Sequence, residues 1–323
     1  MAALDELEAS LRTTWDRDTL AVYADHLQSM GELRGELIVI DMRIEEDGPL
    51  PALVERRKEL LAAWLRSLPP GKVQHGFLDI DATGGDPVEQ VQASLASGGA
   101  PYIRTIAIVG PPKVLLEAVS IVAAAERPSL ARIVLRQWNE GQGWTIRTPE
   151  LERLIAATPN LHTLEIDGYR LFEAAVHPAL RRLRISGWSA IESLWGEGPT
   201  WRSLEELDFA FACQLGERYL PPPPNRELLS FSRFAAVRSL DLSRNEPGEV
   251  DPVNLGGSTN VFAFLRRLEL REELRDLRLP SVLTDVHLQD LRVSLHELPK
   301  LQHLAIRGVR QPIEHPTARI SYF

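Results

Sequence analysis

The sequence predicts an α/β fold in which a small helical N-terminal domain precedes an irregular solenoid built around a parallel sheet. Three observations support this. One-sided apolar stripes run through residues 1–70, as in amphipathic helices. The segment Pro69-Pro70-Gly71 then interrupts the helical pattern. After it, one six-residue phrase returns eight times: apolar, two polar, apolar, one polar, apolar. We therefore place the domains at 1–70 and 71–323.

The first 70 residues are expected to form four helices. Asp16 or Asp18 can cap the second helix, and Gly31 can end it because glycine accepts the left-handed conformation. The fourth helix is predicted from about Ala52 to Leu68. The stripes of the first three helices are Leu4, Leu7 and Leu11, then Leu20, Tyr23, Ala24 and Leu27, then Leu33, Leu37, Ile40 and Ile44.

Each copy of the phrase is expected to end in a short strand, because its last four positions alternate between apolar and polar. A single unit cannot bury its own apolar face, so the units must stack on one another. Helices are predicted between copies at residues 112–125 and 149–157. At most one more copy fits between residues 270 and 301. The eight copies begin at residues 103, 130, 161, 180, 204, 237, 265 and 301.

The phrase resembles the leucine-rich repeat family, whose repeats carry Leu-x-x-Leu-x-Leu followed by a turn Asn. The resemblance covers roughly residues 100–307 and implies a solenoid with a concave parallel sheet. The turn Asn is mostly missing, and only Ser243-Arg244-Asn245 comes near it. The copies are also unevenly spaced, so the expected solenoid is irregular.

The N-terminal domain resembles the bacterial repeat-companion domain, a small helical module that often precedes such repeats. The resemblance rests on Tyr23-Ala24-Asp25-His26-Leu27 and on the segment 31–38, with His26 where that family usually has Trp. Gly76-Phe77-Leu78 also fits the segment that follows the module. The resemblance implies architecture and no activity. Asp25 is expected to pair with Arg34 or to cap a neighbouring backbone.

Charge and composition narrow the possible partners and location. The chain has 36 basic and 45 acidic side chains and a net charge of −9, which opposes binding of a phosphate backbone. No apolar run is long enough for a membrane span, and the first ten residues are acidic rather than signal-like. The single cysteine cannot form an intrachain disulfide. A cytoplasmic protein with no membrane partner is therefore expected.

The common catalytic and cofactor motifs are missing from the sequence. The segment Gly141-Gln142-Gly143 lacks the third glycine of a dinucleotide loop. Cys213, with His162 and His177 before it in the chain, is the best candidate for a nonstandard enzyme site. We predict no catalytic residue, no cofactor and no metal. The histidines weighed as metal ligands are His287 and His303, assigned to adjacent strand phrases, and His296 between them.

The outward positions of the stacked phrases should form two columns, with neighbours about 4.8 Å apart. Arg184 should then lie between Glu165 and Asp208. Opposite charges on adjacent strands can simply stabilise the sheet, or they can form a binding surface on the concave face. The predicted binding residues are Arg132, Glu165, Arg182, Arg184, Glu206, Asp208, Asp241, Arg267, Glu269 and His303.

We predict a non-enzymatic scaffold that binds a protein or peptide on the concave repeat face. In the favoured version it is an accessory that presents a peptide or partner to a separate enzyme. The alternatives are an enzyme with a site near Cys213 and a nucleic-acid binder that uses the arginine column, which the acidic charge opposes. Pro221–Pro224 are predicted to lie in a loop outside the stack. This loop and the N-terminal domain are the other possible contact sites.

Overall fold

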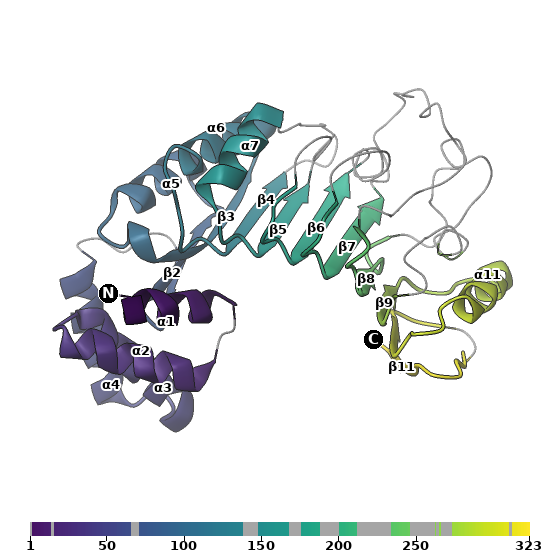
Figure 1. Ribbon diagram of the computed structural model, residues 1–323, viewed down its shortest axis with the longest axis horizontal. Helices are drawn as coiled ribbons and strands as arrows, with labels where there is room; N and C mark the ends of the chain where they lie inside the picture. Colours follow the sequence, from purple (N-terminus) through teal and green to yellow (C-terminus); the bar gives the residue numbers. More distant parts are fainter. Residues whose placement is uncertain are drawn as a thin grey trace. The chain divides into compact units, whose positions relative to one another are not determined.

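The computed structural model describes residues 2–13, 16–65, 71–137, 148–167, 176–187, 200–211, 234–245, 262, 265, 273–309 and 312–323. Four N-terminal helices precede a long, mostly parallel sheet, whose eleven strands in these ranges follow one another in chain order (Figure 1). The predicted α/β fold with N-terminal helices and a parallel sheet is confirmed. The solenoid and the repeat families stay predictions.

The chain forms two compact units. The first comprises Met1–Arg136 and Arg153–His162, and the second comprises Gln137–Glu152 and Thr163–Phe323. The first unit contains the N-terminal helices together with the strands that directly follow them. The domain boundary at residue 70 stays a prediction.

The four N-terminal helices lie where the apolar stripes predict them. They are α1 (Ala2–Thr13), α2 (Arg17–Ser29), α3 (Leu33–Asp47) and α4 (Pro51–Trp64). Asp16 caps α2, because its carboxylate accepts a hydrogen bond from the Thr19 backbone N–H at 2.9 Å. Gly31 has φ +76° between α2 and α3, as its predicted stop role requires. The fourth helix ends at Trp64, earlier than the predicted Leu68.

A hairpin that the sequence analysis does not predict begins the sheet. Strands β1 (Gly71–Gln74) and β2 (Phe77–Ala82) are antiparallel, and β3 (Ile103–Gly110) then pairs parallel with β2. Helices α5 (Pro87–Ala96) and α6 (Pro112–Val122) lie on one side of β2 and β3 (Figure 1). The further elements in this part of the chain are the short 3₁₀ helix η1 (Ala100–Tyr102), strand β4 (Arg132–Gln137) and helix α7 (Thr148–Ala157).

Arg34 joins the N-terminal helices to this hairpin. Its buried guanidinium donates to the Gly76 carbonyl at 3.1 Å and to the Tyr23 hydroxyl at 3.0 Å. It also lies 3.4 Å from the centre of the Tyr102 ring. The expected pair of Asp25 with Arg34 is therefore wrong: Asp25 is exposed on α2, whereas Arg34 faces the core.

Among the described residues after 162, the second unit contains parallel strands and the helix α11. Register is continuous from β5 to β11. Residues 285–288 belong to the helix, whereas residues 276–279 form a strand, so one extra copy lies between 270 and 301, as expected. The elements are β5 (Thr163–Asp167), β6 (Arg182–Gly187), β7 (Glu206–Phe211), β8 (Ser239–Asp241), β9 (Asp276–Leu279), α11 (Asp285–His296), β10 (His303–Ile306) and β11 (Arg319–Tyr322).

The leading apolar residue of each phrase is buried beside its strand. A row of backbone hydrogen bonds also runs just before the strands, in which each N–H donates to the carbonyl of the equivalent residue one strand earlier. Arg238 donates to Glu205 in this row, and Arg275 donates to Arg238. Strand β9 therefore follows β8 directly in the sheet. The buried leading residues of the described strands in the second unit are Leu180, Leu204, Val237, Leu274 and Leu301; Leu265 is also buried, and the rest of its phrase lies outside the described residues.

Candidate functional site

The candidate site is a band of polar side chains on one face of strands β5 to β11, here called the polar strip. It consists of two columns in register across the strands. The first column is Thr163, Arg182, Glu206, Ser239, Asp276, His303 and Arg319. The second column is Glu165, Arg184, Asp208, Asp241, Arg278, Ala305 and Ser321.

Ion pairs connect β5, β6 and β7 across the strip. Arg184 lies between two acids, with its guanidinium 3.6 Å from a Glu165 carboxylate oxygen and 3.2 Å from one of Asp208. Arg182 pairs with Glu206 at 2.9 Å in the other column. The predicted placement of Arg184 between Glu165 and Asp208 is confirmed. These pairs hold the long arginine side chains in fixed directions on a rigid sheet.

Arg244 belongs to the site although it was not predicted as a site residue. It follows β8 and reaches back to β7, where its Nε donates to Asp208 at 2.8 Å, and its Nη2 donates to the Ile185 carbonyl at 3.3 Å. Its neighbour Asn245 is buried and donates to the carbonyls of Phe209 and Leu242, both at 2.8 Å. The turn signal at 243–245 was the clue in the sequence.

Burial raises the pKa of the Asp208 carboxyl above its ordinary value. The guanidinium groups of Arg244 and Arg184 work in the other direction, while the carboxylate of Asp241 on the next strand adds to the increase. Burial and the charge of Asp241 together therefore outweigh the two arginine partners. Asp208 and Asp241 face each other across β7 and β8, an arrangement of like charges that destabilises a sheet unless cations compensate it.

The part of the strip beyond β8 differs from the predicted columns. Strand β9 pairs with both β8 and β10, so Asp276 and Arg278 occupy the positions between Asp241 and His303. The predicted residues Arg267 and Glu269 lie outside the described residues. Asp276 contacts the His303 ring nitrogen at 2.7 Å, which fixes this histidine beside an acid.

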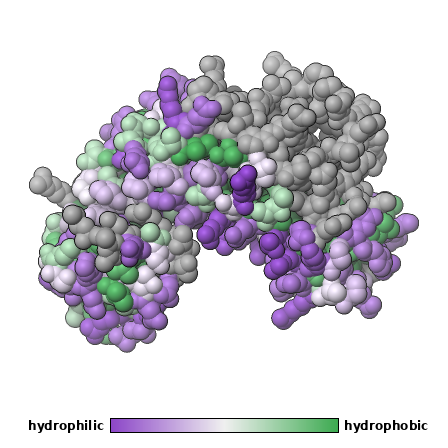
Figure 2. Space-filling model, in the orientation of Figure 1, coloured by the Kyte–Doolittle hydropathy of each residue, from purple (hydrophilic) through white to green (hydrophobic). Residues whose placement is uncertain are grey.

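The negative charge of Asp241 is less closely paired with a basic group than the charges of the other acids of the strip. Its carboxylate accepts the Ser243 backbone N–H at 2.8 Å, and the Arg278 guanidinium lies 3.8 Å away. The Arg278 side chain is 67% exposed and that of Arg182 is 64% exposed, whereas Asp208 and Asp241 are each 24% exposed. Arg182 and Arg278 therefore present their guanidinium groups to solvent, whereas the carboxylates of Asp208 and Asp241 are set more deeply. Figure 2 shows mainly hydrophilic residues around β8, β9 and β11 on the visible face.

The remaining candidates lie in the first unit, have a structural role or fall outside the described residues. Arg132 is exposed at the start of β4, in the first unit. His177 is buried and accepts a hydrogen bond from the Ala179 backbone N–H at 3.2 Å, which is a structural role. The alternative enzyme site near Cys213, the glycine segment 141–143 and the proline segment 221–224 lie outside the described residues.

The histidines considered for metal binding are not brought together. The assignment of His287 to a strand is wrong, because it lies in α11, where its ring packs 5.4 Å from that of Phe262 and burial lowers its pKa. His296 lies in the last turn of the same helix, and His303 lies on β10. Within the described ranges, no group of three or more His, Cys, Asp or Glu residues could hold a metal ion. No helix in these ranges is long and apolar enough to cross a membrane.

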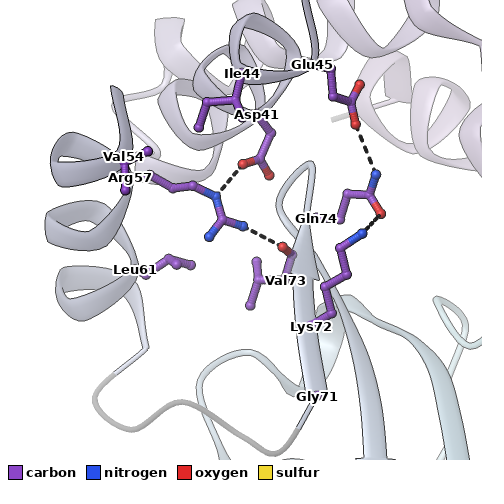
Figure 3. Close-up of a pocket in the computed structure, with 10 residues that line it drawn as sticks. All are labelled: Asp41, Ile44, Glu45, Val54, Arg57, Leu61, Gly71, Lys72, Val73 and Gln74. Atoms are coloured by element: carbon purple, nitrogen blue, oxygen red, sulfur yellow. Dashed lines mark hydrogen bonds and ion pairs between the residues drawn. The ribbon is translucent and has the colours of Figure 1, made fainter. Parts of the chain in front are cut away.

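A separate pocket of about 590 Å³ lies between α3, α4 and β1 in the first unit (Figure 3). Its apolar wall is formed by Ile44, Val54, Leu61 and Val73. Its polar groups contact one another: Arg57 donates to Asp41 and to the Val73 carbonyl, and Gln74 joins Glu45 to Lys72. These contacts stabilise the packing of the helices on the hairpin.

Comparison with known proteins does not identify a family: no protein-family model matches the chain, and no curated protein matches it.

Proposed function

We propose that this protein is a binding scaffold that holds an extended segment of another protein on the polar strip. The strip joins exposed guanidinium groups to a rigid parallel sheet, and this is the single observation that carries the proposal. Guanidinium groups bind carboxylates and peptide carbonyls with defined geometry. Arginines already oriented by carboxylates lose less conformational entropy when they bind.

The proposal includes the finer architecture expected from the sequence, an irregular solenoid of leucine-rich-repeat type with the strip on its inner face. The buried leading residues support it, since a stacked repeat buries them in every turn. Asn245 supports it as well, because its side-chain amide bonds one carbonyl of its own turn and one of the preceding strand. In such a fold the α1–α4 helices cap the apolar end of the stack.

The charge balance of the strip favours a polypeptide over a nucleic acid. Its carboxylates are Glu165, Glu206, Asp208, Asp241 and Asp276, and its guanidinium groups are those of Arg182, Arg184, Arg244, Arg278 and Arg319. Equal numbers of opposite charges give no net attraction for a polyanion. A polypeptide carries both signs and can match them. The accessory role beside a separate enzyme remains part of this proposal.

The experiment places a photo-crosslinking amino acid on the strip in the full-length chain. Ser239 is the site on the strip, and exposed Val293 on α11 is the matched control position. After irradiation in extract from the native cells, the crosslinked partner is identified and its affinity is measured by calorimetry. We expect crosslinks from position 239 and none from position 293, with the extract treated with nuclease to remove nucleic acid.

Affinity measurements then separate binding from sheet stabilisation. Replacing Arg182 and Arg278 together by Gln should weaken binding of the partner by about 1–3 kcal/mol for each arginine replaced. The melting temperature should change little. The control is Arg292→Gln, an exposed arginine on α11, which should change neither quantity. Equal affinity of the double variant and the wild type, or crosslinks only from position 293, would refute the strip as the binding surface.

A further inference from the structure

The arrangement of charges on the polar strip specifies the chemistry of its partner. On β6 the strip carries two arginines and no acid, with Arg182 64% exposed. On β8 it carries Asp241 and an uncharged Ser239. On β7, between them, the strip carries the acids Glu206 and Asp208. The strip therefore changes from positive on β6 to negative on β7 and β8, and this change has a fixed direction in the sheet.

Both of these charges keep unused hydrogen-bonding capacity. Within the part of the chain that the structure describes, Arg182 has one ion-pair partner, a Glu206 oxygen, and a guanidinium has five N–H donors. In the same ranges Asp241 has one cationic neighbour, Arg278 at 3.8 Å, which exceeds hydrogen-bond length. A carboxylate of the partner can bind Arg182, and a cation of the partner can bind Asp241.

The register of the sheet sets the distance between these two groups. Arg182 is in the first column of β6, and Asp241 is in the second column of β8. Two strand spacings and two residues along a strand place their Cα atoms about 12 Å apart. In an extended chain, residues i and i+4 point to the same face and lie about 13 Å apart.

We propose that the partner segment is extended, crosses the strands, and carries an acidic and a basic residue four positions apart, the acid at Arg182 and the base at Asp241. This inference rests on the proposed function, because it names the chemistry of the segment that the strip binds. Segments with two acids or two bases at the same spacing fit less well, since one end then meets a like charge.

The test uses short peptides rich in threonine and serine, which favour extended backbone, titrated into the isotope-labelled full-length protein. The matching peptide contains Glu-Thr-Ser-Thr-Lys. The controls carry two glutamates or two lysines at these positions, or Glu and Lys only two positions apart. We expect saturable shifts of backbone amide signals on β6 to β9, strongest and at the lowest concentration with the matching peptide.

Two conservative variants assign each end of the peptide. Arg182→Gln should lower the affinity for the matching peptide about two- to fivefold. It should leave the affinity for a peptide with Gln in place of Glu unchanged. Asp241→Asn keeps the acceptor for the Ser243 N–H and should weaken only peptides that contain the lysine. Arg292→Gln should change none of these affinities.

The outcomes separate this inference from the proposed function. If peptides with two like charges bind as well as the matching one, the charge pattern is wrong and binding by the strip stands. If no peptide shifts a strip signal while the captured partner loses affinity in the Arg182 and Arg278 double variant, the inference is again wrong and the proposed function survives. If that double variant also binds the partner normally, both are wrong.

Discussion

Replacing Arg34 by Met should destabilise the first unit by about 2–4 kcal/mol. The substitution removes the donor to the buried Gly76 carbonyl, and a buried acceptor left without a partner costs about 1–3 kcal/mol. It also removes the cation from the faces of Tyr23, Phe77 and Tyr102, contacts that contribute about 1–2 kcal/mol when desolvated.

One effect opposes this loss. The buried Arg34 guanidinium has the Glu32 carboxylate 3.9 Å away, and its burial carries a desolvation penalty that methionine does not have. The Tyr23 hydroxyl also keeps its hydrogen bond to Glu8 when Arg34 is removed. For this reason the expected value stays below the sum of the lost contacts. Arg34→Lys retains the charge but loses the planar fork, so it should fall between the wild type and Arg34→Met.

The assay is native-state hydrogen exchange of the full-length chain, which reports the free energy of opening for each amide. The amides of α3, β1 and β2 should lose protection by the stated amount, while those of β6 and β7 in the second unit should not change. Arg43→Met is the matched control, because this arginine lies on the same helix and its side chain is 56% exposed. A loss in α3 of less than about 1 kcal/mol, or a loss equal to that of the control, would refute the reasoning.

Three further predictions concern other parts of the chain. A chain that begins at Gly71 should be less soluble and melt at a clearly lower temperature than the full chain, because in the proposed solenoid the N-terminal helices cap the apolar end of the stack. A melting temperature within a degree or two of the full chain would contradict this capping role. Replacing Pro221–Pro224 by a Gly/Ser linker should leave cooperative unfolding intact, as judged by calorimetry, and loss of cooperativity would place these prolines inside the stack. Burial raises the pKa of Asp208, so the folded chain binds the proton of this carboxyl more tightly than the unfolded chain does. The contribution of Asp208 to the free energy of unfolding therefore falls as the pH rises from about 4 through the raised pKa. Asp208→Asn should flatten this part of the curve of unfolding free energy against pH, and an unchanged slope would contradict the assigned cause.

Much of the candidate site was predictable because strand residues alternate between two faces. Once the phrase is recognised, Leu183 and Ile185 must point into the core, and Arg182 and Arg184 must point outward. The register across β5 to β7 then follows from aligning the phrases. What the phrase cannot encode is a contact made by a residue outside it, which is why Arg244 was missed.

Strand β11 was missed for a related reason. In register with β10, the segment that ends in Arg319–Tyr322 has Thr317 at the leading position, where the other copies have a large apolar residue. A usable signal lies just before it, in His315-Pro316, which repeats His177-Pro178 before β6. In both places the His Nδ1 accepts backbone N–H groups of the following turn, from Ala179 in one and from Thr317 and Ala318 in the other.

The sequence by itself determined which segments of this protein have one apolar face, and therefore where most helices and strands lie. Tertiary structure decided between segments that satisfied the same pattern. Residues 274–279 and 283–288 both fit the phrase, but only the first can pair with β8 and β10. The second continues into α11, where Leu288 is buried and Val286 is 62% exposed. Apolar periodicity specifies a buried face, whereas the choice between strand and helix depends on which neighbour satisfies the backbone hydrogen bonds.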